Sequence, residues 1–304
     1  MVGGFVTLTV TMPEGPEVRR SADTLSQLLV GKRIVNAFPG KKGRYADNPP
    51  DGYTEFLGDL RGRGSAEILE VNCKGKFMWW KLAFPMNHTG PRREQDFWYM
   101  WCTYGMSGQW TADETPYTAF GVEYAEANSP ADVQPPSLYF NDTRHFGTLK
   151  FVNSDKDHAK KLASLGPDML NDPPTWQVFM DRLLKKPQKT LAEVLMDQSV
   201  ISGVGNYVKA EALYLSELSP HRTVDSLKMA EMERLRNQIM NVMKASLNTG
   251  GATFSTYRNP DGSKGRAQSR FVVYGNKTDP LGNPVVREDT LDGRTTHWVP
   301  AIQR

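Results

Sequence analysis

The spacing of apolar residues predicts a helix near the start of the chain. Between residues 16 and 30 the apolar positions recur at intervals of four, three and four, which places them on one helical face: Val18, Ala22, Leu25 and Leu29. Pro16 suits the first turn of a helix, and Gly31 suits its end. We therefore expect one amphipathic helix over residues 16–30.

From about residue 33 to residue 153 the pattern changes to short runs rich in aromatic and β-branched residues, separated by Gly, Pro and Asn turns. The predicted strands are 66–72, 76–84, 97–103, 138–141 and 148–152. The polar stretches are expected to be loops: 41–52, 85–95 and 113–136. This part of the chain predicts an antiparallel β-sandwich or barrel.

The second half of the chain has a helical pattern. Residues 155–174 are expected to form a linker, and the predicted helices after it are 176–185, 191–196, 206–216 and 227–248. After Gly250 and Gly251 the chain returns to turns and short strands, with a hairpin expected around residues 271–274 and Trp298. The predicted fold class is therefore α+β.

Composition excludes several classes of protein. The 304 residues are enough for two domains, and 39% hydrophobic with 23% charged residues is typical of a soluble protein. No apolar run approaches the roughly 18–20 residues that cross a bilayer, and residues 1–11 lack the basic start of a secretion signal. With only two cysteines, Cys73 and Cys102, a reduced intracellular compartment is expected.

The charge distribution is more informative than the net charge of +3. Residues 258–277 hold five basic residues and one acid, and a second basic cluster, which includes Lys189, spans residues 182–189. Such clusters suit a phosphate backbone. On charge alone, however, a solvated surface is the simpler interpretation.

Four short segments carry the candidate chemistry: MPEGPE at 12–17, CKGKF at 73–77, DQSVISGVGN at 197–206 and GRTT at 293–296. Each one is a weak signal. Together and in this order they resemble the formamidopyrimidine-DNA glycosylase/endonuclease VIII family, and further matches occur at 104–108, 141–147, 165–168 and 273–275. The resemblance extends from Met12 to Gln303.

The resemblance implies a domain organisation. Residues 12–154 would form the β-sandwich catalytic domain with its flanking helix, and residues 155–174 the linker. Residues 175–252 would form the helix-two-turn-helix DNA-binding domain, and residues 253–304 the lesion loop and a finger hairpin. Residues 1–11 would be an extension that is absent from the mature protein.

The resemblance also implies a mechanism. In the family the initiator Met is removed, and the amine of the following proline attacks the sugar C1′, expels the damaged base and leaves a Schiff base. Pro13 would be this nucleophile, Glu14 the acid and base, and Lys76 the holder of the adjacent phosphate or sugar. An α-amino group has a pKa of about 7.7–8.0, so roughly a third is free base near pH 7.5, against about 0.1% of a lysine. β- and then δ-elimination would cut the strand.

Excision requires the base to leave the duplex, which costs a few kcal/mol in lost stacking and pairing. The family fills the void with a Met, an Arg and a Phe, which match Met106, Arg144 and Phe146. Both apolar side chains lie in Gly-flanked turns and not in the middle of a strand, which makes a purely structural role less convincing.

DNA-binding residues follow from the same resemblance. Gly203 and Gly205 would let backbone N–H groups approach phosphate, and Asn206 suits a helix N-cap that could also reach it. A cap with no role in binding is an equally good interpretation of Asn206. Arg294 and Lys189 would contact phosphate. Two carboxylates are expected to support the site: Glu17 and Glu211.

The finger departs from the family pattern. Its usual form binds zinc through four cysteines, whereas VPAIQ at 299–303 stands where the family has Cys-Pro-x-Cys-Gln, and no cysteine follows Cys102. Zinc is therefore excluded on ligand count. The hairpin is expected to be a zincless finger with apolar replacements, and no cofactor is implied.

The second departure concerns Pro13, which is internal in the chain as written and whose amide nitrogen could not act as a nucleophile. Translation from Met12 is our preferred explanation. Two functions stay open: a bifunctional glycosylase and abasic-site lyase, or a DNA-binding family member without chemistry if residues 1–11 are retained. Glu14-Gly15-Pro16 and the missing zinc favour the endonuclease VIII branch and oxidised pyrimidines, with formamidopyrimidines and oxidised purines as alternatives.

The expected partner is damaged double-stranded DNA, with single-stranded or bubble DNA as an alternative and no membrane. The protein is expected to be a monomer inside the cell, located with the DNA in a nucleus, a nucleoid or a viral replication site.

Overall fold

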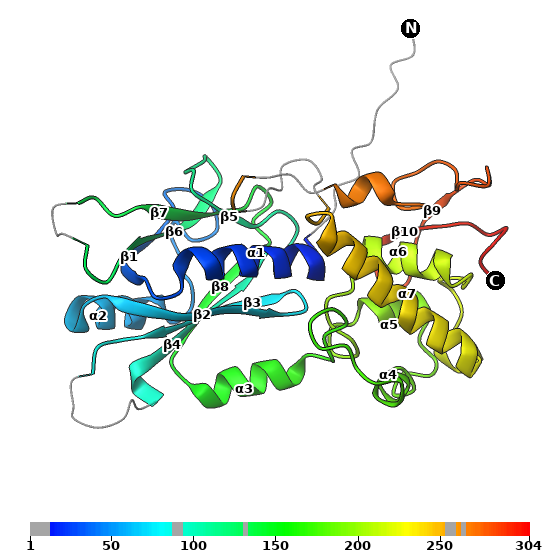
Figure 1. The fold of residues 1–304 in the computed structure, drawn as a ribbon, viewed down its shortest axis with the longest axis horizontal. Coiled ribbons are helices and arrows are strands. Elements are labelled where there is room, and N and C mark those ends of the chain that lie inside the picture. Colours follow the sequence, from blue (N-terminus) through cyan, green and yellow to red (C-terminus); the bar gives the residue numbers. More distant parts are fainter. Residues whose placement is uncertain (1–12, 87–93, 130–132, 253–259, 263–265) are drawn as a thin grey trace, which may run out of the picture.

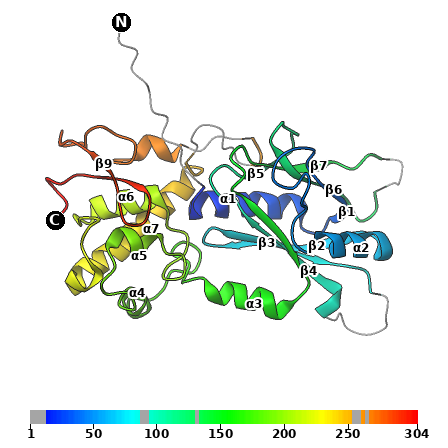
Figure 2. The same ribbon diagram turned by 180° about the vertical axis from the view of Figure 1, so that it is seen from behind.

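The structure is a computed structural model that describes residues 13–86, 94–129, 133–252, 260–262 and 266–304. A sheet lobe and a helical lobe lie side by side (Figure 1), and the view from behind shows the same division (Figure 2). Helix α1 (Gly15–Leu29) runs along the sheet lobe with its N-terminal end directed at the helical lobe. The expected extension 1–11 and residues 253–259 of the expected lesion loop lie outside the described residues.

Helix α1 confirms the helix expected over residues 16–30. Its predicted stripe is buried to 1% exposure or less and joins the core of the sheet lobe: Val18, Ala22, Leu25 and Leu29. Val30 and Gly31 end the helix, and Gly31 has the positive φ of 87° that glycine adopts without strain. The stripe therefore fixes which side of α1 faces the sheet.

The sheet lobe is built on one antiparallel sheet of eight strands in the order β5-β7-β6-β1-β2-β3-β4-β8. The strands are β1 (Arg33–Pro39), β2 (Ala66–Lys74), β3 (Phe77–Ala83), β4 (Phe97–Thr103), β5 (Gln109–Thr111), β6 (Thr118–Ala125), β7 (Ser137–Asn141) and β8 (Thr148–Val152). The sheet folds over, because rings from its two halves meet: Trp80 lies 5.0 Å from Trp110, and Phe120 lies 5.8 Å from Phe151. The predicted antiparallel sandwich is thus confirmed.

Five helices and strands described in this lobe were not predicted from the sequence: β1, β5, β6, α2 and α3. The expected loop 113–136 contains β6, which pairs with both β1 and β7. Helix α2 (Tyr53–Arg63) interrupts the strand pattern and buries Phe56 and Leu60, four residues apart. The expected linker contains α3 (Asp155–Ser164), which begins at the N-cap Ser154 and covers an aromatic cluster on the outer face of the sheet: Phe77, Trp79 and Tyr99.

The helical lobe contains α4 (Trp176–Leu183), α5 (Leu191–Met196), α6 (Asn206–Leu215) and α7 (Met229–Asn248), as expected, together with the short 3-10 turns at Val224–Ser226 and Ala267–Arg270. A further 3-10 turn at Glu94–Asp96 precedes β4. Thr175 and Thr190 cap α4 and α5 through their side chains. None of the described helices is both long and apolar enough to span a membrane.

The C-terminal hairpin pairs β9 (Val286–Asp289) with β10 (Thr295–Trp298). The expectation that residues 271–274 belong to this hairpin is wrong, because they form a turn. Three consecutive N–H groups of that turn, at residues 272–274, donate to the carboxylate of Glu211 over 2.7–2.9 Å. A buried carboxylate therefore holds a segment whose aromatic residues suggested a strand.

Candidate active site

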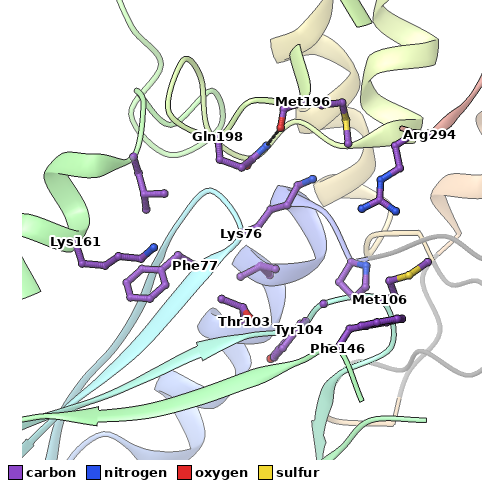
Figure 3. Close-up of a pocket in the computed structure, with 14 residues that line it drawn as sticks. Lys76, Phe77, Thr103, Tyr104, Met106, Phe146, Lys161, Met196, Gln198 and Arg294 are labelled. Carbon is purple, nitrogen blue, oxygen red and sulfur yellow. Dashed lines mark hydrogen bonds between the residues drawn. The ribbon is translucent and has the colours of Figure 1, made fainter. Parts of the chain in front are cut away.

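A cavity of about 620 Å³ lies where the two lobes meet, and it brings together residues that the sequence analysis placed far apart. Its lining includes five of the predicted site residues: Pro13, Lys76, Met106, Phe146 and Arg294. Lys76 comes from the β2–β3 turn and Arg294 from the C-terminal hairpin, and both point toward the same space (Figure 3). Seven further lining residues were given no role from the sequence, although four stand in the segments that resemble the family: Phe77, Thr103, Tyr104, Lys161, Leu165, Met196 and Gln198.

The carboxylate of Glu14 crosses from the sheet lobe to the start of α6. Its Oε1 accepts the N–H of Tyr207 at 2.8 Å, and its Oε2 accepts the N–H of Val208 at 3.2 Å. The first N–H groups of a helix have no partner within the helix, so a carboxylate there is stabilised by hydrogen bonds and by the helix dipole. Glu14, although distant in sequence, acts as the cap of α6.

The expectation that Asn206 is the N-cap of this helix is therefore wrong. The N-cap is Gly205, and Asn206 is the first residue of the helix. A Cβ atom on Gly205 would lie 2.2 Å from Cδ of Glu14. Gly205 has no side chain because the carboxylate of Glu14 occupies that space. Asn206 Nδ2 instead donates to the backbone oxygen of Thr295 in the hairpin, at 2.9 Å.

Gly203 also serves the contact between the lobes. Its φ of +96° suits glycine, its carbonyl accepts the N–H of Gly15 at 2.9 Å, and its own N–H donates to Oε1 of Gln198 at 3.0 Å. In the described structure a protein oxygen accepts this N–H, and the phosphate contact of Gly203 stays a prediction.

The position of Lys76 depends on Gly75 and on Asp168, whose role the sequence analysis did not predict. The N–H of Gly75 donates to Oδ2 of Asp168 at 2.7 Å, and a Cβ on Gly75 would lie 2.6 Å from the backbone nitrogen of Gly203. The turn before Lys76 is thus fixed against the helical lobe. Nothing in the sequence around Gly75 and Lys76 indicates that Asp168, far along the chain, is the hydrogen-bond partner of this turn.

Glu17 connects four segments beneath the cavity. It is 1% exposed and accepts the N–H of Glu14 at 2.9 Å, the N–H of Ala252 at 2.6 Å and the hydroxyl groups of Tyr207 and Ser246. Burial raises the pKa of Glu17, while these hydrogen bonds oppose the shift. Its predicted supporting role matches this position, where it holds the backbone of Glu14.

Glu14 and the cavity-lining Lys76 shift each other's pKa. Burial raises the pKa of Glu14 to about 7, against the opposing charge of Lys76. Burial also lowers the pKa of Lys76, against the opposing charge of Glu14 and with the help of the nearby cation Arg294. A carboxyl group whose pKa lies near 7 can both donate and accept a proton at neutral pH.

Two turns present the predicted void-filling residues at the edge of the cavity. Phe146 is 54% exposed, and the guanidinium of Arg144 lies 5.4 Å from the centre of its ring. Met106 and Phe146 line the cavity (Figure 3), whereas Arg144 is absent from the described lining. The buried Asp142 joins the turns by accepting the hydroxyl of Ser107 and the N–H of Arg144.

The remaining predicted residues lie apart from the cavity. Lys189 forms an ion pair with Glu193 at 2.8 Å and lines a separate hollow of about 350 Å³. Glu211 holds the turn at residues 272–274 and does not line the cavity. Arg258 and Lys264 of the basic cluster lie outside the described residues.

Known protein families match most of the chain. The formamidopyrimidine-DNA glycosylase N-terminal domain matches residues 12–149, its H2TH domain residues 165–258 and its C-terminal domain residues 266–304. A formamidopyrimidine-DNA glycosylase of Thermus thermophilus is 31% identical over 298 residues, with 96% of this chain and 98% of the relative covered. One from Listeria innocua is 29% identical, covering 96% and 100%.

Solved structures agree with these matches. The crystal structure of the MutM (Fpg) protein of Thermus thermophilus has a TM-score of 0.76 and 29% identity, and the alignment covers 96% of this chain and 98% of that one. A Lactococcus lactis Fpg mutant in complex with Fapy-dG-containing DNA has a TM-score of 0.77 at 20% identity, covering 96% and 100%. At that identity the second likeness supports the fold alone.

The contact between Gly205 and Glu14 predicts the effect of adding one methyl group. Gly205→Ala should lower the free energy of unfolding by about 1–3 kcal/mol, because the carboxylate of Glu14 must leave its two N–H donors. Gly62→Ala is the control, since a Cβ there meets no atom within 4 Å and should raise stability by about 0.5–1 kcal/mol. Urea unfolding measures both, and equal changes would contradict the proposed contact.

Proposed function

Because the chain belongs to the formamidopyrimidine-DNA glycosylase family, we propose that it excises oxidised bases from DNA in base-excision repair and then cleaves the strand through a Schiff base on the nitrogen of Pro13. The observation that carries this proposal is the single cavity shared by Pro13, Lys76 and Arg294, with the carboxyl group of Glu14 buried beside them. A nucleophile, a proton donor and two cations for phosphate are the groups that this reaction requires.

The nucleophile requires a free N-terminus at Pro13. We propose that the active chain begins there, after translation from Met12 and removal of that Met. The match of the N-terminal family domain starts at residue 12, which supports this assignment. A secondary amine has a lone pair for attack on C1′ of the sugar, whereas the nitrogen of an internal proline is an amide and has none available.

Glu14 is the proposed proton donor. Protonating the ring oxygen of the sugar would help to open it as the amine attacks and the base leaves, and the resulting carboxylate would accept a proton during elimination. The pKa of about 7 supports this assignment, because a useful fraction of the carboxyl group is protonated at neutral pH. Lys76 and Arg294 would hold the phosphates next to the lesion through charge-assisted hydrogen bonds.

Met106 and Phe146 are proposed to fill the space left by the flipped nucleotide. The exposed ring of Phe146 supports stacking on a base of the duplex, and Met106 is a flexible apolar wedge beside it. Arg144, placed over that ring, would donate hydrogen bonds to the orphaned base. Phe146 is exposed and Met106 is half-buried, and neither belongs to the two large cores of the described residues.

The hairpin β9–β10 is proposed to be a zincless finger. Both cysteines of the chain are buried in the sheet lobe, in β2 and β4. Val299, which stands in the family's ligand segment, is fully buried in the core of the helical lobe, and Ile302 packs against that core. Apolar packing would therefore replace the metal as the link between the hairpin and the helical lobe.

Oxidised pyrimidines are the proposed preferred lesions, on the basis of Glu14-Gly15-Pro16 and the missing zinc ligands. The relatives carry the name formamidopyrimidine-DNA glycosylase, so formamidopyrimidines are the competing substrate class. The alternative function is binding of damaged DNA without chemistry, which would follow if residues 1–11 stayed attached to Pro13. Borohydride trapping decides both the lesion class, with oligonucleotides that carry different lesions, and the choice between an enzyme and a DNA-binding protein without chemistry.

A chain that begins at Pro13 should form a covalent adduct with abasic-site DNA when borohydride is present, since the reduced Schiff base is stable. A chain that begins at Met1 and is not processed should form none, because its Pro13 nitrogen is an amide. Peptide mapping should locate the adduct on Pro13, and Lys76→Ala should still be trapped. Equal trapping by the unprocessed chain would identify a different nucleophile, with Lys76 as the first candidate.

The pKa of Glu14 predicts a pH dependence for base removal. Because burial raises this pKa to about 7, the acid form predominates below that pH and is lost above it. The excision rate divided by the rate of Schiff-base trapping on a preformed abasic site should fall about tenfold per pH unit above pH 7. The ratio cancels the titration of the amine. Glu14→Gln should excise poorly and show no such fall; a fall of the same size would assign it to another group.

Void filling predicts a difference between two substrates. Met106→Ala and Arg144→Ala should slow excision of a damaged base by about tenfold, equivalent to ~1.4 kcal/mol, and slow cleavage of a preformed abasic site much less. The reason is that an abasic site has no damaged base to extrude. Met86→Ala, which truncates an exposed Met after β3, is the matched control. Equal losses on the two substrates would indicate a structural role.

A further inference from the structure

The direction of Arg294 depends on the turn that carries it. Residues 290–294 connect β9 to β10, and this turn is closed by the N–H of Thr290 donating to the carbonyl of Arg294 at 3.1 Å and by the N–H of Gly293 donating to that of Thr290 at 2.9 Å. The side chain of Arg294 leaves the turn and points into the cavity (Figure 3). Whatever fixes this turn therefore also fixes a cation at the cavity.

A buried ion pair fixes the turn to α6. Nζ of Lys209 lies 2.6 Å from Oδ2 of Asp292, and their side chains are only 0% and 3% exposed. The other carboxylate oxygen of Asp292 accepts the hydroxyl of Thr290 at 2.5 Å. One helical turn before Lys209, Asn206 donates to the carbonyl of Thr295, so two side chains on one face of α6 hold both sides of the turn.

Lys209 is too deeply buried to contact DNA itself. Its charge nevertheless reaches the cavity, because Lys209 and Arg294 both act to lower the pKa of Lys76. A buried carboxylate such as that of Asp292 requires a cation or several hydrogen bonds, since burying an unpaired charge is costly. If Lys209 lost its charge, Asp292 would need another cation. Arg294, two residues later in the same turn, would be the nearest one along the chain.

We infer that Lys209 is a positioning residue: by neutralising Asp292 inside the hairpin turn, it keeps the guanidinium of Arg294 free for the phosphate of the damaged strand. This inference rests on the proposed function, because the phosphate contact of Arg294 belongs to it. Lys209 acts through Arg294 and does not touch the substrate. The pair also joins α6 to a hairpin from which the family's usual zinc ligands are absent.

The test compares affinities for a duplex that carries one tetrahydrofuran abasic-site analogue, measured by fluorescence anisotropy at moderate salt. Lys209→Met should weaken binding by about tenfold, since Asp292 then competes for Arg294. In an Arg294→Ala background the same substitution should have no further effect. The double variant Lys209→Met/Asp292→Asn, which removes the competing carboxylate, should recover to within about threefold of the native affinity.

Two controls separate this role from a loss of folding. Lys32→Met removes one positive charge beyond the far end of α1 and should leave the affinity unchanged. Thermal unfolding of each variant shows whether it is folded at the temperature of the assay, and the double variant tests the inference even where Lys209→Met is unstable.

The inference is overturned if Lys209→Met weakens binding equally with and without Arg294, or if the double variant binds as weakly as the single one. These results are distinct from a failure of the proposed function. If the proposed function were wrong, the native protein itself would show no preference for the abasic-site duplex over an undamaged duplex of the same sequence.

Discussion

The carboxylate of Glu14 is the interaction on which the arrangement of the site depends. It comes from the N-cap of α1 in the sheet lobe and accepts the N–H groups of the second and third residues of α6 in the helical lobe. One side chain therefore satisfies an obligatory requirement of a helix and joins the lobes at the cavity. Any relative movement of the lobes would separate Glu14 from α6, so the position of the proposed acid and the closure of the cavity are physically coupled.

Backbone packing around that carboxylate leaves no room for side chains. An added Cβ on Gly205 would lie 2.2 Å from Cδ of Glu14, one on Gly75 would lie 2.6 Å from the backbone nitrogen of Gly203, and one on Gly15 would lie 3.0 Å from the backbone of Gly203. Gly203 and Gly205, whose contact with phosphate stays a prediction, contact other parts of the protein here. Close approach of three backbone segments explains why Lys76, on one lobe, and Arg294, on the other, reach the same cavity.

Charged groups are concentrated in this buried region, and burial is expensive for each of them. The cost is reduced by pairing and hydrogen bonding: Glu17 accepts several donors, and Lys209 is paired with Asp292. Burial also shifts the pKa of Glu14 upward and that of Lys76 downward. The same desolvation that lowers stability thus brings the pKa of the Glu14 carboxyl to about 7, where the group can donate and accept a proton at neutral pH.

The sequence by itself determined the helices and strands that a local pattern of apolar residues defines, and the site residues that stand in distinctive motifs. The apolar stripe of α1, strands β4 and β8, and helices α4 to α7 follow from periodicity, and the motifs indicated Pro13, Lys76 and Arg294. The tertiary structure alone decided the rest, because it depends on contacts across long stretches of chain. Strand β6 follows a polar stretch that suggested a loop, and it is defined by pairing with β1 and β7. The cap of α6 comes from a carboxylate that no local pattern connects to it, and the partner of Lys209 lies in a hairpin at the other end of the lobe's sequence.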